Sequence, residues 1–280
     1  MIPLLVLVAT SYAGPEESVI PKSVRQAAIL NANEPLPDRM KAISDTLLGR
    51  PYTADPLGEG AGIDPDPFVR YDTFDCLTFV EEVVALSLAA DPEEAATIRT
   101  SLRYGGAPKY TTRNHFMEHQ WIPAALENHW LKDTTATYGP THTMVRRVTE
   151  ETWKRWRSRG KFAHTDEELP LGTMKLEVLG LDDAIAAASR IKPGTIVLTV
   201  RANLPSSPIW ISHLGFTIPA DVPTVRHATK MGSGGTKDHR LVWYLNHLKT
   251  YKNWPAVGIS LLEPVEFGPR LSRLPPSKKQ

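Results

Sequence analysis

The stretch Tyr71-Asp72-Thr73-Phe74-Asp75-Cys76 leads directly into apolar residues at helical spacing, from Phe79 and Val80 to Val83, Val84 and Leu86. Asp75 is a residue type that caps helix N-termini, and the apolar positions recur three and four residues apart. We therefore expect a buried helix that begins at Cys76, the single cysteine of the chain. The positive end of a helix dipole favours a thiolate, and with a cationic partner it lowers the pKa of a thiol. The sequence thus places its cysteine where a nucleophile is expected.

Further helices are predicted on both sides of Cys76. Upstream, apolar residues at helical spacing run from about Val24 to Leu48 and end at Gly49-Arg50-Pro51-Tyr52, a helix stop followed by an extended turn. Residues 53–69 are rich in Gly, Pro and Asp and are expected to form a loop. Downstream, Asp91-Pro92 predicts the start of a second helix and Gly105-Gly106 its end.

The last third of the chain has the pattern of β-strands. Four apolar runs separated by Pro- and Gly-containing loops are predicted as strands: Thr195–Val200, Ile209–Ile218, Val222–Thr229 and Val257–Leu262. Residues 107–190 have no clear order, apart from a helix expected to end near Trp130, and are expected to form a helical insertion. Helices followed by strands indicate an α+β fold with an antiparallel sheet.

Two histidines on these strands are candidate partners of Cys76. His213 lies in the middle of the second strand and His227 near the end of the third. A hairpin centred on Ala220 would place the two residues directly opposite each other on one sheet face, within hydrogen-bonding reach. A register shift of one residue would move His227 to the other face. This arrangement of nucleophile, base and orienter is typical of thiol hydrolases.

Other residues near Cys76 are weaker candidates. The backbone N–H of Cys76 points into a possible oxyanion hole, and the Tyr52 hydroxyl is a second donor for it. Asp75 either only caps its helix or also binds a substrate amine or amide. Cys76 could instead be a buried apolar residue, and His213 and His227 could be satisfied core histidines.

Composition excludes several classes of protein. The chain has 280 residues, with 32 Lys and Arg against 31 Asp and Glu, so it lacks the charge of a nucleic-acid binder. One cysteine allows neither an intrachain disulfide nor a thiolate zinc site. His115 and His119 have the spacing of zinc ligands on one helix face, with His129 as a possible third, but a structural or groove-lining role is favoured and no metal or cofactor is expected.

Two further motifs also have simpler interpretations. The run Trp153–Arg157 could contact glycan, although a solvated amphipathic helix is the favoured interpretation. The stretch Gly232–Lys237 lacks the residue order of a phosphate loop and is predicted to be a flexible loop beside His227.

The first residues resemble an export signal. The apolar run Ile2–Ala9 is followed by Ser11-Tyr12-Ala13, small residues at the spacing that a signal peptidase accepts, although no Lys or Arg precedes the run. Residues 1–13 are therefore expected to be a signal peptide, and the protein to be periplasmic or secreted in a bacterial envelope. The run is too short to span a bilayer.

Taken together, these residues resemble the NlpC-type cysteine peptidases, papain-like enzymes that cleave bacterial cell-wall peptides. The matching signatures occur in order: Leu48–Tyr52, Phe74-Asp75-Cys76, and Ser212–Phe216 followed by His227-Ala228. The stretch Tyr71–Cys76, together with Arg113–Phe116 and Gly258–Pro264, resembles the N-acetylmuramoyl-L-alanine amidase-like branch. The family usually has Ser-Gly after the cysteine, whereas Leu77-Thr78 follows here.

The resemblance covers roughly residues 40–265 and implies a papain-like fold with the helix of Cys76 packed on the sheet. It implies a 14–39 extension before this domain and a 266–280 tail after it. It also implies Cys76 as nucleophile, His213 as base and then acid, His227 as orienter, and Asn114 and Ser212 near the substrate groove. The implied substrate is a muropeptide or peptidoglycan, cleaved at the amide between the lactyl group of muramic acid and L-Ala by a monomer without a cofactor. A sister enzyme that cleaves after D-Glu, and a catalytically silent wall-binding module, are the alternatives.

Overall fold

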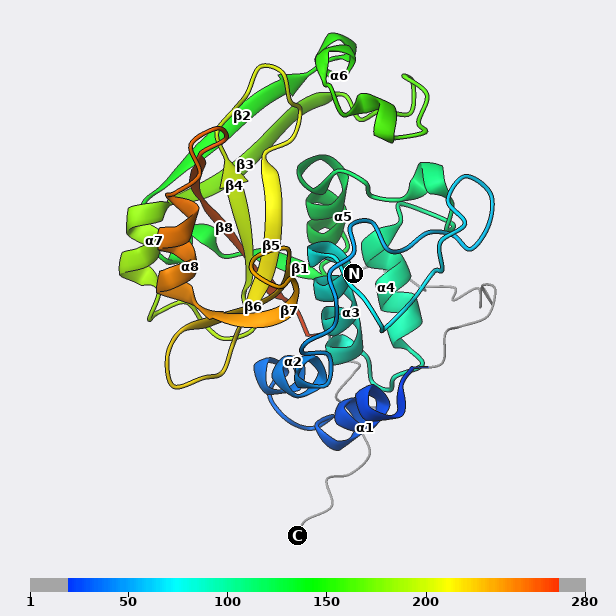
Figure 1. Cartoon of the computed structure of the whole chain (residues 1–280), viewed down its shortest axis with the longest axis vertical. Coiled ribbons are helices and arrows are strands. Elements are labelled where there is room, and N and C mark those ends of the chain that lie inside the picture. Colours follow the sequence, from blue (N-terminus) through cyan, green and yellow to red (C-terminus); the bar gives the residue numbers. More distant parts are fainter. Residues whose placement is uncertain (1–19, 267–280) are drawn as a thin grey trace, which may run out of the picture.

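An eight-stranded antiparallel sheet organises residues 20–266, the part of the chain that the computed structural model describes (Figure 1). The predicted signal peptide and nearly all of the predicted tail lie outside these residues. The strand order is β2-β3-β8-β4-β5-β6-β7, and β1 pairs with β8. The strands are β1 (Leu131–Asp133), β2 (Thr141–Val148), β3 (Gly172–Gly180), β4 (Ile196–Arg201), β5 (Ile211–Ile218), β6 (Thr224–Thr229), β7 (Gly235–Arg240) and β8 (Ala256–Pro264).

Helices cover both faces of the sheet. One face carries α2 and α3, with α1 and α4 packed outside them, and the other face carries α7 and α8 (Figure 1). No helix within residues 20–266 has the length and apolar character needed to cross a membrane. The helices are α1 (Lys22–Leu30), α2 (Leu36–Asp45), α3 (Cys76–Leu88), α4 (Ala95–Arg103), α5 (Ile122–Glu127), α6 (Glu150–Arg155), α7 (Leu181–Ala187) and α8 (Leu241–Leu248).

The buried helix predicted at Cys76 is α3. Every residue of α3 except Leu77 is buried, and Phe79 stacks on Phe216 of β5 with ring centroids 5.7 Å apart. Two carboxylates are part of this buried surface. Glu81 and Glu82 are neutralised by Arg103 and Arg99, which come from the α4 helix packed alongside. The helix is thereby fixed from both sides.

The helix predicted over about Val24–Leu48 is wrong in its continuity. The structure has two helices there, α1 and α2, and Pro35 stands at the N-cap of α2. A proline lacks the N–H that a continuous helix would use, so the chain turns before α2 begins. Val24 and Met40 are both fully buried in the same core as α3.

The insertion predicted over 107–190 is helical only in part: the helix expected to end near Trp130 is α5, but the largest element is a β-hairpin. Strands β2 and β3 pair along eight residues, and β3 continues the sheet by pairing with β8 at Leu179 and Ile259. Strand β2 is the edge of the sheet and reads Thr-His-Thr-Met-Val-Arg-Arg-Val, with most of its residues partly or fully exposed. An edge strand facing solvent has no apolar run from which it could be predicted.

The four predicted strands are confirmed as β4, β5, β6 and β8, within one to two residues at each end. Strand β7 is an addition, because its sequence Gly-Thr-Lys-Asp-His-Arg is polar and followed a glycine-rich stretch predicted as a loop. The expectation of an antiparallel sheet in an α+β arrangement is confirmed.

Candidate active site

Cys76 is held at the first position of α3 by a complete helix cap. Asp75 has an extended backbone, and its carboxylate accepts hydrogen bonds from Thr78 N and Thr78 Oγ1, both at 2.8 Å. The second Asp75 oxygen accepts a longer bond of 3.3 Å from Asp55 N. These contacts show Asp75 as the cap of the helix, as predicted from its residue type.

The thiol lies where two strands of the sheet separate. The pairing of β5 and β6 ends at Phe216 and Arg226, although both strands continue past these residues. On the unpaired side of β5, the backbone N–H of Leu214 hydrogen-bonds the Cys76 thiol. The thiol also interacts electrostatically with Tyr244, which belongs to α8 on the opposite face. The thiol therefore lies beside the backbone of Leu214, the residue that follows His213 on β5.

His213 and His227 form a hydrogen-bonded pair on the face covered by α8. His213 Nε2 and His227 Nδ1 are 2.7 Å apart, with the rings nearly perpendicular. His227 is completely buried, and the ring of Tyr244 packs edge-on against it with centroids 5.4 Å apart. Tyr244 is in turn fixed by a 2.5 Å hydrogen bond with Thr199 of β4. No hydrogen bond joins the Cys76 thiol to an imidazole within residues 20–266.

The predicted register of this hairpin is wrong by two residues. Phe216 pairs with Arg226 and Ile218 with Thr224, so the hairpin is centred on Asp221 instead of Ala220. His213 and His227 are diagonal neighbours as a result. A shift by two residues keeps both side chains on the same face, and diagonal side chains of this length still meet.

The charge state of the site differs from the one that the helix dipole alone predicts. Burial and the Asp75 carboxylate raise the pKa of the Cys76 thiol to about 12. Burial and the nearby Arg201 lower the pKa of His213 to about 4, and burial beside His213 lowers the pKa of His227 to about 2. At neutral pH the resting site therefore holds a neutral thiol and neutral imidazoles.

Tyr52 is close to the thiol. It forms a parallel bridge with Phe74, two residues before Cys76, and Lys230 lies over its ring at 5.3 Å. Burial and the neighbouring Cys76 and Asp75 raise the pKa of the Tyr52 hydroxyl above its ordinary value. The hydroxyl is therefore a neutral donor beside Cys76.

Ser212 and Asn114 have other contacts. Ser212 is the extra residue of a bulge, since Thr199 pairs with His213 and Val200 with Ile211. Its hydroxyl accepts a 2.7 Å hydrogen bond from Arg201 Nε. Asn114 is buried and donates to the Leu102 carbonyl at the end of α4, 3.1 Å away. Within the described residues no hydrogen bond joins Asn114 to Cys76 or to either histidine.

The residues considered for zinc are separated. His115 Nε2 contacts the Tyr110 carbonyl at 2.9 Å and His119 Nε2 the Pro208 carbonyl at 3.3 Å, while His129 is exposed. Within residues 20–266 no group of three or more His, Cys, Asp or Glu residues is arranged to hold a metal ion.

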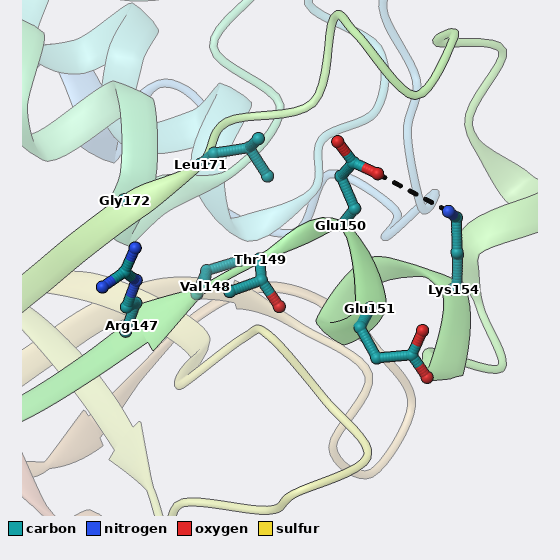
Figure 2. Close-up of a pocket in the computed structure, with 8 residues that line it drawn as sticks. All are labelled: Arg147, Val148, Thr149, Glu150, Glu151, Lys154, Leu171 and Gly172. Carbon is teal, nitrogen blue, oxygen red and sulfur yellow. Dashed lines mark ion pairs between the residues drawn. The ribbon is translucent and has the colours of Figure 1, made fainter.

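The aromatic run that begins at Trp153 is fixed by contacts of its own. Trp153 of α6 is buried, and its indole N–H donates to the Pro170 carbonyl at 2.9 Å. It therefore offers no open face to a glycan. A pocket of about 570 Å³ opens beside this helix at the end of the β2–β3 hairpin, where Glu150 pairs with Lys154 (Figure 2). None of the residues predicted for the active site lines it.

Two residues near the histidines were not predicted. His239 of β7 contacts His227, with 2.8 Å between His239 Nδ1 and His227 Nε2. Arg201 of β4 connects Ser212 to the Trp254 carbonyl and borders a pocket of about 420 Å³ with Thr250, Tyr251, Lys252 and Asn253. The glycine-rich stretch before β7 is the sequence signal for His239, because a tight turn there returns the chain alongside β6.

Comparisons with known proteins identify structures of the same fold. A crystal structure of a Legionella pneumophila protein of family DUF1460 superposes with a TM-score of 0.75 at 22% identity, over 87% of this chain and 93% of that one. An N-acetylmuramoyl-L-alanine amidase from Bacteroides uniformis superposes with a TM-score of 0.64 at 20% identity, over 87% and 99%. These similarities show a shared fold. No curated protein matches the sequence.

The family model described as AmiA-like, N-acetylmuramoyl-L-alanine amidase-like, matches residues 42–251. This range contains Cys76, His213, His227 and His239. Because the match covers well over half of the chain, the protein belongs to the N-acetylmuramoyl-L-alanine amidase-like family.

Proposed function

We propose that the protein is a cysteine amidase that hydrolyses the bond between the lactyl group of N-acetylmuramic acid and L-Ala in peptidoglycan fragments. The observation that carries the proposal is the position of Cys76. Its thiol lies at the N-terminus of α3 and accepts a hydrogen bond from the backbone of Leu214. His213, the residue before Leu214, is hydrogen-bonded to His227. This arrangement supports Cys76 as nucleophile, His213 as base and His227 as orienter, each from a different element.

The neutral resting state determines the order of the proton transfers. As Cys76 Sγ bonds to the lactyl carbonyl carbon, its proton moves to His213, so no thiolate is needed beforehand. The tetrahedral oxyanion is stabilised by the Cys76 backbone N–H and the Tyr52 hydroxyl. The C–N bond then breaks, and His213 gives its proton to the leaving L-Ala amine. Water, deprotonated by His213, finally hydrolyses the thioester and restores the thiol.

We also propose the finer assignments that accompany this activity. The helix of Cys76 packed on an antiparallel sheet is consistent with a papain-like fold of the NlpC type. A cell-wall substrate is consistent with a periplasmic or secreted protein. The pocket beside Arg201 contains two cationic side chains, Arg201 and Lys252, which suit the carboxylates of a stem peptide.

The test is mass spectrometry of defined muropeptides incubated with the full chain and, separately, with Cys76→Ser. An amidase releases the intact stem peptide and the free disaccharide, and Cys76→Ser releases neither. Truncated stems still attached to sugar would show a γ-D-glutamyl endopeptidase instead. Binding to insoluble peptidoglycan without any cleavage would show a wall-binding module, and either result would overturn the amidase proposal.

A further inference from the structure

Three imidazoles form a continuous hydrogen-bonded row that leads away from Cys76. His213 Nε2 meets His227 Nδ1 at 2.7 Å, and His227 Nε2 meets His239 Nδ1 at 2.8 Å. The rings of His227 and His239 are perpendicular, with centroids 5.0 Å apart. His227 is fully buried, whereas His239 is partly exposed, so the row runs from the site towards solvent.

In a row of neutral imidazoles, all the N–H···N hydrogen bonds must point the same way along the row. Each neutral ring has one N–H and one acceptor nitrogen, so the tautomer of one ring determines that of the next. The Nε2 of His213 is occupied by His227, which leaves Nδ1 to accept the thiol proton. His213 can be a base only when its Nε2 carries the hydrogen and donates to His227.

The same argument extends to the third ring. If His213 donates to His227 Nδ1, the hydrogen of His227 is on Nε2, where it is completely buried and needs an acceptor. The atom at that place is His239 Nδ1. The opposite direction would put a hydrogen on His213 Nδ1 and would block the base.

We propose that His239 is a positioning residue: by accepting a hydrogen bond from His227, it keeps His213 in the tautomer that can take the proton of Cys76. This inference rests on the proposed thiol–imidazole chemistry. It concerns a residue that does not touch the reacting atoms and acts through His227.

The surroundings of His239 support this role. Its ring stacks on Trp243 of α8 with centroids 4.6 Å apart, which fixes the plane of the imidazole. Burial and the charge of Lys237 on the same strand lower the pKa of His239, with His247 acting in the same direction and Asp238 against it. His239 is thereby kept neutral, with a lone pair for His227.

The test compares the wild type with His239→Asn, His239→Ala and a matched control, His247→Ala. The Asn oxygen occupies the place of Nδ1 and accepts a hydrogen bond, whereas Ala offers no acceptor. His247 also stacks on Trp243 and is outside the hydrogen-bonded row. Three quantities are measured: the imidazole tautomers by ¹⁵N NMR, the alkylation rate of Cys76 by iodoacetamide, and kcat and KM on muropeptides.

We expect the hydrogens of His213 and His227 on Nε2 in the wild type. His239→Ala should lower kcat and the alkylation rate by roughly tenfold, the worth of one hydrogen bond, with KM unchanged. His239→Asn should restore most of the loss, and His247→Ala should behave as wild type.

The proposal is overturned if His227 carries its hydrogen on Nδ1 in the wild type. It is also overturned if His239→Ala alkylates at the wild-type rate, or if His239→Asn is as slow as His239→Ala. The NMR and alkylation measurements need no substrate. They therefore remain decisive if muropeptides are not cleaved, a result that would count only against the proposed amidase activity.

Discussion

Gly215 lies directly against His227: a Cβ atom at position 215 would come within 2.8 Å of His227 Cβ and 2.6 Å of the Arg226 carbonyl oxygen. Gly215 and His227 lie one residue beyond Phe216 and Arg226, the last registered pair of β5 and β6. Because Gly215 has no side chain, His227 has room to approach His213.

We predict that Gly215→Ala displaces His227 and lowers kcat by roughly tenfold or more, because a methyl group forced against backbone must move it. The cost in unfolding free energy is expected to be about 1–3 kcal/mol. Gly160→Ala is the control, since a Cβ there meets nothing within 4 Å. Wild-type kcat in Gly215→Ala would show that the position of His227 does not matter.

The pH dependence of activity distinguishes a neutral Cys76 thiol and His213 imidazole from a thiolate–imidazolium ion pair. Because the pKa of His213 is lowered to about 4 and that of Cys76 is raised to about 12, the working protonation state extends across the neutral range. We therefore expect kcat/KM to be flat between roughly pH 5 and 8 and to show no step near 6.5, where a free histidine titrates.

The alkylation rate of Cys76 checks the same point without substrate. With a neutral thiol, alkylation near neutral pH depends on transfer of the thiol proton to His213, and the rate rises further at higher pH as the thiolate fraction grows. A fast plateau beginning near pH 6 would instead demonstrate a preformed thiolate and imidazolium, and would contradict the charge state derived from burial.

The sequence was sufficient to place the candidate site residues on their helix and strands but not to give their electrostatics. Cys76 follows a capping residue, which predicts its place at the start of a helix. His213 and His227 are an even number of residues apart, so the two histidines share a sheet face even though the predicted hairpin centre was one residue off. Thiol burial depends on tertiary packing, which brings Leu214 of β5 and Tyr244 of α8 near the thiol and which no local pattern encodes. The histidine row was incomplete because β7, like β2, is a polar edge strand without an apolar run.

Stability should also depend on pH. An unfolded histidine takes up its proton near pH 6.5, whereas burial lowers the pKa of His213 to about 4 and that of His227 to about 2. Below pH 6.5 the unfolded chain therefore binds more protons than the folded one, and the unfolding free energy falls by up to about 1.4 kcal/mol per pH unit for each imidazole. Urea unfolding between pH 7.5 and 5 measures this slope.

His227→Asn provides the control for that slope. It removes one buried imidazole, so its unfolding free energy should fall less steeply with decreasing pH than that of the wild type. Equal slopes in the two proteins would show that His227 takes up its proton as readily in the folded state as in the unfolded state.

The buried ion pair of Glu82 and Arg99 joins α3 to α4. Arg99 Nε and Nη2 donate to Glu82 at 2.5 and 2.8 Å, and the Tyr71 hydroxyl adds a 2.6 Å hydrogen bond. Burial works to raise the pKa of Glu82, but Arg99 outweighs it and the pKa is lowered. Glu82→Gln leaves a buried, uncompensated guanidinium, so we predict a loss of about 3–5 kcal/mol in unfolding free energy.

Two variants make this measurement specific. Glu151→Gln breaks an exposed ion pair with Arg155 and should cost no more than about 0.5 kcal/mol. Adding Arg99→Met to Glu82→Gln removes the stranded charge and should recover part of the loss. A double variant no more stable than Glu82→Gln would mean that the cost comes from packing.

Tyr52→Phe tests the oxyanion hole. The Tyr52 hydroxyl interacts with Cys76 and Asp75, and burial beside them raises its pKa, so it remains an O–H donor at every assay pH. A donor aimed at the developing oxyanion acts mainly in the transition state, and its loss should lower kcat by about 10²-fold, to 10³-fold at most, with KM nearly unchanged. The matched control is Tyr104→Phe, which removes a buried tyrosine hydroxyl bonded to Glu59, away from Cys76. An increase in KM at constant kcat would assign Tyr52 to substrate binding, and unchanged kinetics would leave the Cys76 backbone N–H as the remaining proposed donor.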